Sequence, residues 1–98
     1  MFTFEEIKKR AVPIAIKHGV DSISLFGSYA RNEQNDNSDL DFLIDKGKIT
    51  GFFSYYALVN ELEENFKTHV DLLTTDADDK DFLNKIKSEA KVLYAKWW

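Results

Sequence analysis

The 98-residue sequence predicts an α/β (α+β) fold, in which helices flank a small mixed β-sheet of three or more strands. Two observations lead to this class. Segments with helical spacing of apolar residues alternate along the chain with short, strongly apolar segments typical of strands. Neither a repeat nor a low-complexity linker divides the chain, and 44% hydrophobic residues suffice for one modest core. We therefore expect a single domain over residues 1–98.

The first element is predicted to be a helix. Thr3 and Glu6 have the spacing of a capping box, with Thr3 as the N-cap residue. Pro13 interrupts the helical pattern, so we expect a kink or a restarted helix there. Gly19 fits the left-handed position that ends a helix. One face collects the apolar residues Phe4, Ile7, Ala11, Ile14 and Ala15.

Three strands and two more helices follow in the prediction. The strands cover residues 22–27, 40–45 and 69–74, each rich in apolar or β-branched residues. A helix from about Ser54 is indicated by the spacing of Tyr55, Leu58, Val59, Leu62 and Phe66. After a polar turn, a final helix is predicted to carry Phe82, Ile86, Ala90, Leu93 and Tyr94 on one face.

Composition excludes several classes of function. The chain has no cysteine, which excludes disulfides and thiolate metal sites. No apolar run approaches the roughly 18 residues of a membrane-spanning helix, and Met1 is not followed by a signal-peptide pattern. The net charge of −4 argues against an extended nucleic-acid surface, which needs clustered Lys and Arg. We expect a soluble, cytoplasmic protein.

Three aspartates are the first candidate site. Asp39 and Asp41 alternate at the start of an apolar strand, so their side chains should share a face, and Asp71 can join them if its strand is adjacent. Two carboxylates 4 Å apart repel by about 4 kcal/mol at an effective dielectric constant near 20. Such a cluster takes up protons or holds cations, and oxygen ligands favour Mg²⁺ or Mn²⁺. Two such ions can clamp a phosphoryl group.

A Gly-Ser turn supplies the second half of the candidate site. Gly27 follows a predicted strand and permits both a tight turn and a close approach of backbone to a ligand. The N–H groups that follow would form an anion site, and the Ser28 hydroxyl could donate to a phosphate oxygen. Arg31 could add a positive charge nearby.

Each of these features is weak by itself. A Gly-Ser pair is far more often an ordinary loop than a phosphate site, and most Asp-x-Asp pairs are solvated turn residues. The joint pattern is more specific, because Asp39 follows the Gly27-Ser28 pair after ten residues and the acids lead into apolar strands.

The stretch LFGSYARNEQNDNSDLDFLID closely resembles the nucleotidyltransferase signature of the DNA polymerase β superfamily. The greatest similarity is to the minimal nucleotidyltransferases, small MntA-like antitoxins paired with HEPN-domain toxins. It extends over nearly the whole chain, with SISLFGSYAR, SDLDFLID, HVDLL and EAKVLYA as its main segments. The central motif is specific, and the flanking segments support it.

The resemblance implies roles for particular residues. Asp39 and Asp41 would bind two Mg²⁺ or Mn²⁺ ions, Asp71 would be the third ligand and help deprotonate an attacking hydroxyl, and Gly27 with Ser28 would bind phosphate. The family usually has Gly where this chain has Asn32. Asn tolerates left-handed conformations better than most residues, so we expect the turn to survive.

The same resemblance implies an enzyme and a partner. The chain would transfer AMP from ATP to a tyrosine hydroxyl of a HEPN toxin, acting as the antitoxin of a toxin–antitoxin pair. A domain this small has no second lobe to enclose a small acceptor, so we expect a partner, in a homo- or hetero-oligomer. Two alternatives stay open: an antitoxin that masks its toxin by binding alone, and a nucleotidyltransferase for small molecules such as aminoglycosides that needs a helical partner subunit.

Some residues are ambiguous in the sequence. An aromatic cluster at the start of the helix near residue 54 fits either the core or a partner surface: Phe52, Phe53, Tyr55 and Tyr56. His69 could lie near the aspartates, but a surface position is favoured. The Trp97-Trp98 pair could pack on the last helix or serve as an exposed anchor.

Overall fold

The computed structural model describes residues 1–97 as four helices and four strands that alternate, apart from minor turns, along the chain. No helix in this described part is long and apolar enough to cross a membrane. In chain order, the elements are α1 (Phe4–Lys17), β1 (Ser22–Phe26), α2 (Gly27–Ala30), β2 (Leu40–Asp45), α3 (Gly51–Phe66), β3 (Val70–Thr74), α4 (Lys80–Glu89) and β4 (Lys91–Ala95).

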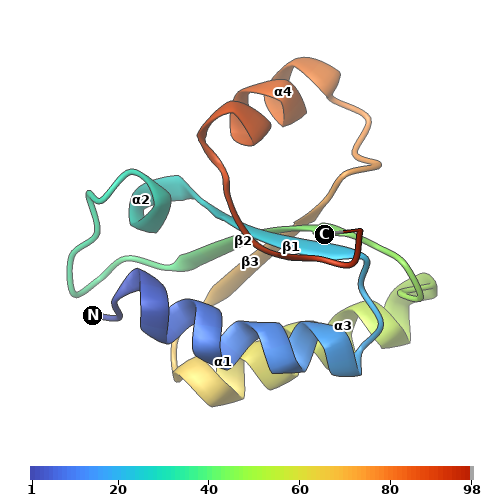
Figure 1. The fold of residues 1–98 in the computed structure, drawn as a ribbon, viewed down its shortest axis with the longest axis horizontal. Helices are drawn as coiled ribbons and strands as arrows, with labels where there is room; N and C mark the ends of the chain where they lie inside the picture. Colours follow the sequence, from blue (N-terminus) through green and yellow to red (C-terminus); the bar gives the residue numbers. More distant parts are fainter. Residues whose placement is uncertain (98) are drawn as a thin grey trace.

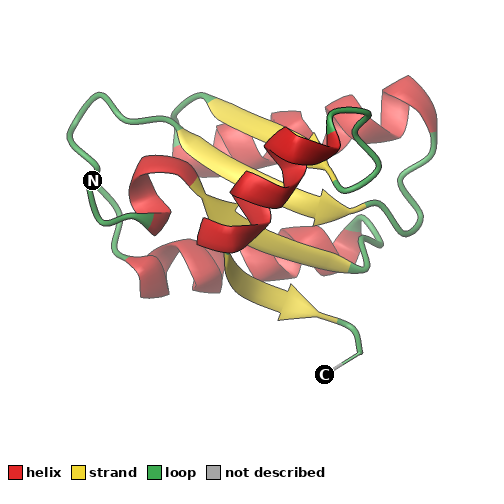
Figure 2. Cartoon of the chain, turned by 90° about the horizontal axis from the view of Figure 1, so that it is seen from above, coloured by secondary structure: helices red, strands yellow, loops and turns green. Residues whose placement is uncertain are grey.

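The strands form one mixed sheet in the order β3-β2-β1-β4. β1 is antiparallel to both β2 and β4, whereas β2 and β3 are parallel and are joined through α3. Helices α1 and α3 lie on one face of the sheet and α4 crosses the other (Figures 1 and 2). The predicted fold class, helices flanking a small mixed sheet, is confirmed.

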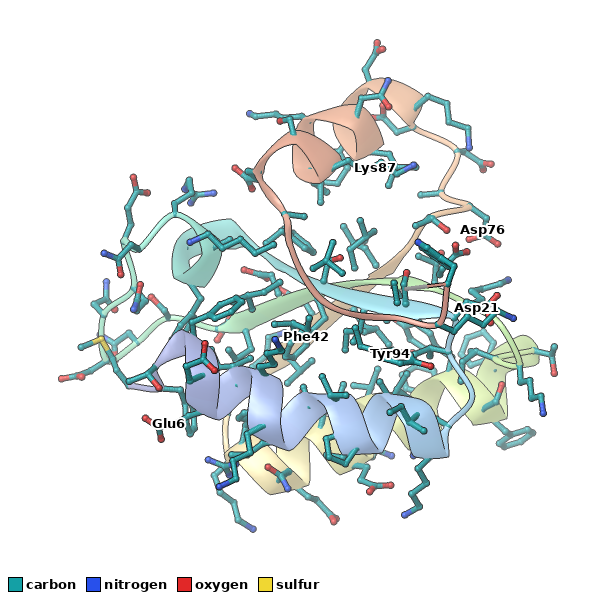
Figure 3. All side chains as sticks on the ribbon, viewed as in Figure 1. Glu6, Asp21, Phe42, Asp76, Lys87 and Tyr94 are labelled. Carbon is teal, nitrogen blue, oxygen red and sulfur yellow. The ribbon has the colours of Figure 1, made fainter. Side chains whose placement is uncertain are left out.

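Each face of the sheet has its own core. The larger core lies between the sheet and helices α1 and α3, where Phe42 is fully buried (Figure 3). The smaller core lies under α4, where Leu83 and Ile86 pack against Phe26 and Leu43. Because alternate strand residues face opposite sides, β2 sends Leu40, Phe42 and Ile44 into the first core and Leu43 into the second.

The first helix begins where predicted and ends before Gly19, which has the predicted left-handed conformation, but it is not divided at Pro13. The Glu6 N–H donates to the Thr3 hydroxyl, and the Thr3 N–H donates to the Glu6 carboxylate, which completes the capping box. The helix does not restart at Pro13 but runs through it to Lys17. Pro13 is on the exposed side, where water can bond the carbonyl that loses its helical donor.

The prediction for the end of the chain is wrong in part. The last helix ends at Glu89, and Leu93 and Tyr94 belong to β4, not to that helix. The segment KVLYA is rich in residues that favour strands, and the edge of β1 offers it backbone hydrogen bonds. Phe82, expected on the buried face of α4, is 49% exposed. Trp97 is also exposed, and Trp98 lies outside the described residues.

Candidate functional site

The sheet brings the three predicted aspartates to one edge. Phe26 pairs with Asp41 across β1 and β2, and Asp41 pairs with Asp71 across β2 and β3. Asp39 immediately precedes β2, and it joins His69 and Asp71 in one cluster of ligand atoms. The expected adjacency of the two acidic strands is therefore confirmed.

Asp41 is the most perturbed acid of this group. Its carboxyl is partly buried, and this burial raises its pKa to about 6. A hydrogen bond with Asp71 and the negative charges of Asp71 and Asp39 act in the same direction, while Arg31 opposes them. The Asp41 carboxyl therefore keeps its proton to a higher pH than an ordinary aspartate does, and a bound cation would oppose this shift.

His69 lies in the site, contrary to the favoured prediction of a surface role alone. Its Nε2 is 2.9 Å from Asp71 Oδ1, and its Nδ1 is 3.3 Å from Glu63 Oε2. The hydrogen bond to Asp71 is the main cause of a raised pKa of His69. The His69 ring therefore favours its protonated form beside the exposed carboxylate of Asp71. The two side chains meet because His69 is two residues before Asp71 and residues two apart share a side of a strand.

The donor set fits a divalent cation. Asp39, His69 and Asp71 each offer one ligand atom, and these atoms lie within 4.8 Å of one another. Asp41, the other predicted ligand, is outside this set and hydrogen-bonds to Asp71. Carboxylate oxygens suit Mg²⁺ or Mn²⁺, and an imidazole nitrogen is compatible with Mn²⁺.

Gly27 is required by its contact with Asp41. Its φ is +74°, in the left-handed region, and a Cβ atom built on it would lie 2.1 Å from Asp41 Oδ2. The turn after β1 therefore fits directly against the acidic cluster. The predicted phosphate-binding and metal-binding halves are in contact because β1 ends where β2 begins.

Arg31 is held beside this turn by two glutamates. Its Nε donates to Glu33 at 2.9 Å, and its Nη1 lies 3.2 Å from Glu89 Oε1. Asn32 follows in a left-handed conformation with φ of +59°, as its tolerance of that conformation predicts. The turn therefore accommodates Asn at this position, as expected from the sequence.

A cavity of about 810 Å³ lies over the acids. Asp41, His69 and Asp71 line it together with Phe82 and the aromatic side chain of Tyr56. A neighbouring cavity of about 340 Å³ shares Tyr55 and Tyr56 with it and is otherwise lined by residues from the loop before α3, from the start of α3 and from the end of β3. The Tyr55 hydroxyl donates to the Leu72 carbonyl at 2.6 Å, which fixes the wall between the two cavities.

Comparisons with known proteins agree with this geometry. Residues 9–97 match the family model described as polymerase beta, nucleotidyltransferase. A protein of Methanocaldococcus jannaschii, named a "putative protein adenylyltransferase", is 42% identical over 85 residues, which are 87% of this chain and 91% of the relative. The protein adenylyltransferase MntA of Thermococcus cleftensis is 34% identical over 77 residues, 74% of this chain and 78% of the relative.

Two solved structures share the fold. A toxin–antitoxin crystal structure with AMP-PNP aligns with a TM-score of 0.79 at 20% identity, over 90% of this chain and 73% of the other. A second structure contains a tri-AMPylated Shewanella oneidensis HEPN toxin in complex with an MNT antitoxin. It aligns with a TM-score of 0.70 at 17% identity, over 90% of this chain and 69% of the other.

Proposed function

Because this chain belongs to the polymerase β nucleotidyltransferase family, we propose that it transfers AMP from ATP to a hydroxyl group, that of a tyrosine, on a HEPN-domain toxin. The observation that carries this proposal is the contact between the Gly27 turn and the acidic cluster. A phosphate-binding turn and a cation-binding cluster in contact are what a nucleoside triphosphate requires.

The residues divide into two groups by role. Gly27, Ser28 and Arg31 would hold the terminal phosphates, and Asp39, Asp41 and Asp71 would hold two Mg²⁺ or Mn²⁺ ions. When bound, such ions neutralise the charge of the triphosphate and of the leaving pyrophosphate. The acceptor oxygen forms a bond to the α-phosphorus as the bond from that phosphorus to the bridging oxygen breaks. The acceptor proton passes to the Asp71 carboxylate.

His69 supports the proton transfer in this proposal. Its hydrogen bond holds Asp71 in one orientation, and Glu63 holds the other ring nitrogen. Asp71 is exposed, so a hydroxyl group carried by another protein can reach it.

The aromatic surface, defined here as Phe52, Phe53 and Tyr56, is where we place the toxin. Phe52 is 74% exposed and Phe53 is 94% exposed, so these two residues do not belong to the core, which was one of the two positions that the sequence allowed. Tyr56 lines the 810 Å³ cavity over the acids, which makes the aromatic surface continuous with the site. Exposed aromatic residues are typical of binding surfaces. A toxin seated there would have its acceptor hydroxyl near Asp71.

Replacing Phe52 and Phe53 together by Ala should weaken transfer to the toxin. The expected loss is about 10-fold or more in kcat/KM for the toxin, because buried aromatic anchors dominate interface energy. Binding of ATP, measured by calorimetry, should not change. The matched control is Ile16→Ala, which removes an exposed apolar side chain from α1. Equal kcat/KM values for the double variant and wild type would contradict this placement.

The exposed aromatic residues also fit an antitoxin that only masks its toxin. The two functions can be distinguished by the growth of cells that produce the toxin together with the Asp39→Asn/Asp41→Asn protein. If the protein acts as an enzyme, the double variant should no longer protect the cells from the toxin. If it acts by masking alone, the double variant should still protect them. Full protection by the double variant, together with no AMP on toxin from cells with the wild-type protein, would contradict the proposed transfer.

A further inference from the structure

One carboxylate already occupies donors that the proposed function assigns to phosphate. Glu89 Oε1 lies 3.3 Å from the Gly27 backbone nitrogen and 3.2 Å from Arg31 Nη1. Its second oxygen, Oε2, lies 3.3 Å from the same Arg31 nitrogen. A single carboxylate therefore accepts hydrogen bonds from a backbone N–H and a guanidinium at the two ends of α2, as a phosphate would.

The position of Glu89 is fixed by packing. It is the last residue of α4, and Ile86, one turn earlier, is buried in the core under that helix. Two residues later Lys91 pairs with Leu25 of β1, which ties the end of α4 to the end of the strand that precedes Gly27. The Glu89 side chain is only 25% exposed. Its contact with the turn is thus built into the fold.

The surroundings also allow the carboxylate to leave. A cavity of about 230 Å³ is lined by Arg31, Lys85 and Glu89, and it shares Phe26 and Phe82 with the larger cavity over the acids. Lys85 lies four residues before Glu89 on α4, within reach of it along a helix surface. Within residues 1–97 Lys85 forms no ion pair, so a displaced Glu89 would have a cation available.

We propose that Glu89 is an affinity-determining residue that competes with the phosphates of the nucleotide for Gly27 and Arg31. This inference rests on the proposed function, since it needs the nucleotide to use that turn. A bound triphosphate must displace the carboxylate and overcome its negative charge. Glu89 thereby weakens the binding of ATP and favours the departure of pyrophosphate as it returns to the same donors.

The test is the Kd of ATP, and separately of inorganic pyrophosphate, measured by calorimetry with Mg²⁺ present and no acceptor. Glu89→Gln and Glu89→Ala should each lower both values about 3- to 10-fold, since the competing charge is gone. Glu33→Gln is the matched control, because Glu33 also pairs with Arg31 and has no bond to Gly27. It should change Kd by less than about twofold.

Three results would contradict the inference. Unchanged or weaker binding in both Glu89 variants, with wild type binding ATP, would show that Glu89 only positions Arg31, and the proposed function would stand. Equal tightening by Glu33→Gln would show a general charge effect with no competition at the turn. Absence of ATP binding by all four folded proteins, verified by their melting curves, would contradict the proposed function and this inference together.

Discussion

Replacing Asp41 by Asn should abolish nucleotide transfer and make the metal-free protein more stable at pH 7. Transfer is lost because the amide cannot supply the negative charge that holds cations against a triphosphate. We expect kcat to fall by about 1,000-fold or more. Stability rises because Asn removes a carboxylate that burial, Asp71 and Asp39 all disfavour in its charged form.

The raised pKa of Asp41 determines whether the wild-type protein gains or loses stability as pH rises. Burial and neighbouring acids raise the pKa of Asp41 from 3.8 in the unfolded chain to about 6 in the fold. The folded state therefore binds more protons between these values, and wild-type stability falls as pH rises through them. Asp41→Asn should be more stable at pH 7, by about 1 kcal/mol once solvent screening is allowed for. Below pH 4 this advantage should vanish.

Urea unfolding at pH 7 and at pH 3.5, in EDTA, measures this difference. Ser24→Ala is a suitable control, because Ser24 lies on the neighbouring strand and carries no titratable group. Its effect on the free energy of unfolding should be the same at both pH values. An Asp41→Asn protein less stable than wild type at pH 7 would show that the carboxylate is stabilised by its surroundings, contrary to the raised pKa.

Replacing Gly27 by Ala should damage both the fold and the activity. The new Cβ would lie 2.1 Å from Asp41 Oδ2, and the φ of +74° strains any L-residue. We expect a loss of about 2–4 kcal/mol in the free energy of unfolding, together with loss of transfer as Asp41 is displaced.

Gly51→Ala separates the two causes. Gly51 has a similar φ of +79°, but a Cβ there would meet nothing within 4 Å. Its substitution should cost only the backbone strain, about 1–2 kcal/mol, and should leave the acids in place. The comparison is made by chemical unfolding. If both variants lose the same stability, Gly27 is required for its conformation alone, and the contact with Asp41 is not needed to explain it.

The fold was predictable wherever the pattern of apolar residues had a single interpretation. The alternation in β2 indicated which residues face the core, and the capping box located the start of α1. The end of the chain was ambiguous, because Ile86, Ala90, Leu93 and Tyr94 also fit helical spacing. The segment from Lys91 forms a strand because it pairs with the edge of β1. Pairing between residues so far apart in the chain cannot be predicted from the local spacing of apolar residues.

The candidate site followed the same rule. Spacing predicted that Gly27 and the aspartates would lie together, because they are at the ends of strands that become neighbours in the sheet. The period of two in a strand could also have placed His69 beside Asp71. Glu89 left no such signal, because its contact with Gly27 depends on how α4 crosses the sheet.

Transfer of AMP by the acidic cluster to a partner protein can be measured on the partner itself. The measurement is intact-mass spectrometry of a HEPN-domain toxin after incubation with the wild-type chain, ATP and Mg²⁺. We expect a toxin heavier by one or more AMP units, located on a tyrosine by peptide mapping, and no adduct with Asp39→Asn/Asp41→Asn. An unmodified toxin with the wild-type chain, or an equal adduct with the double variant, would contradict the proposed transfer.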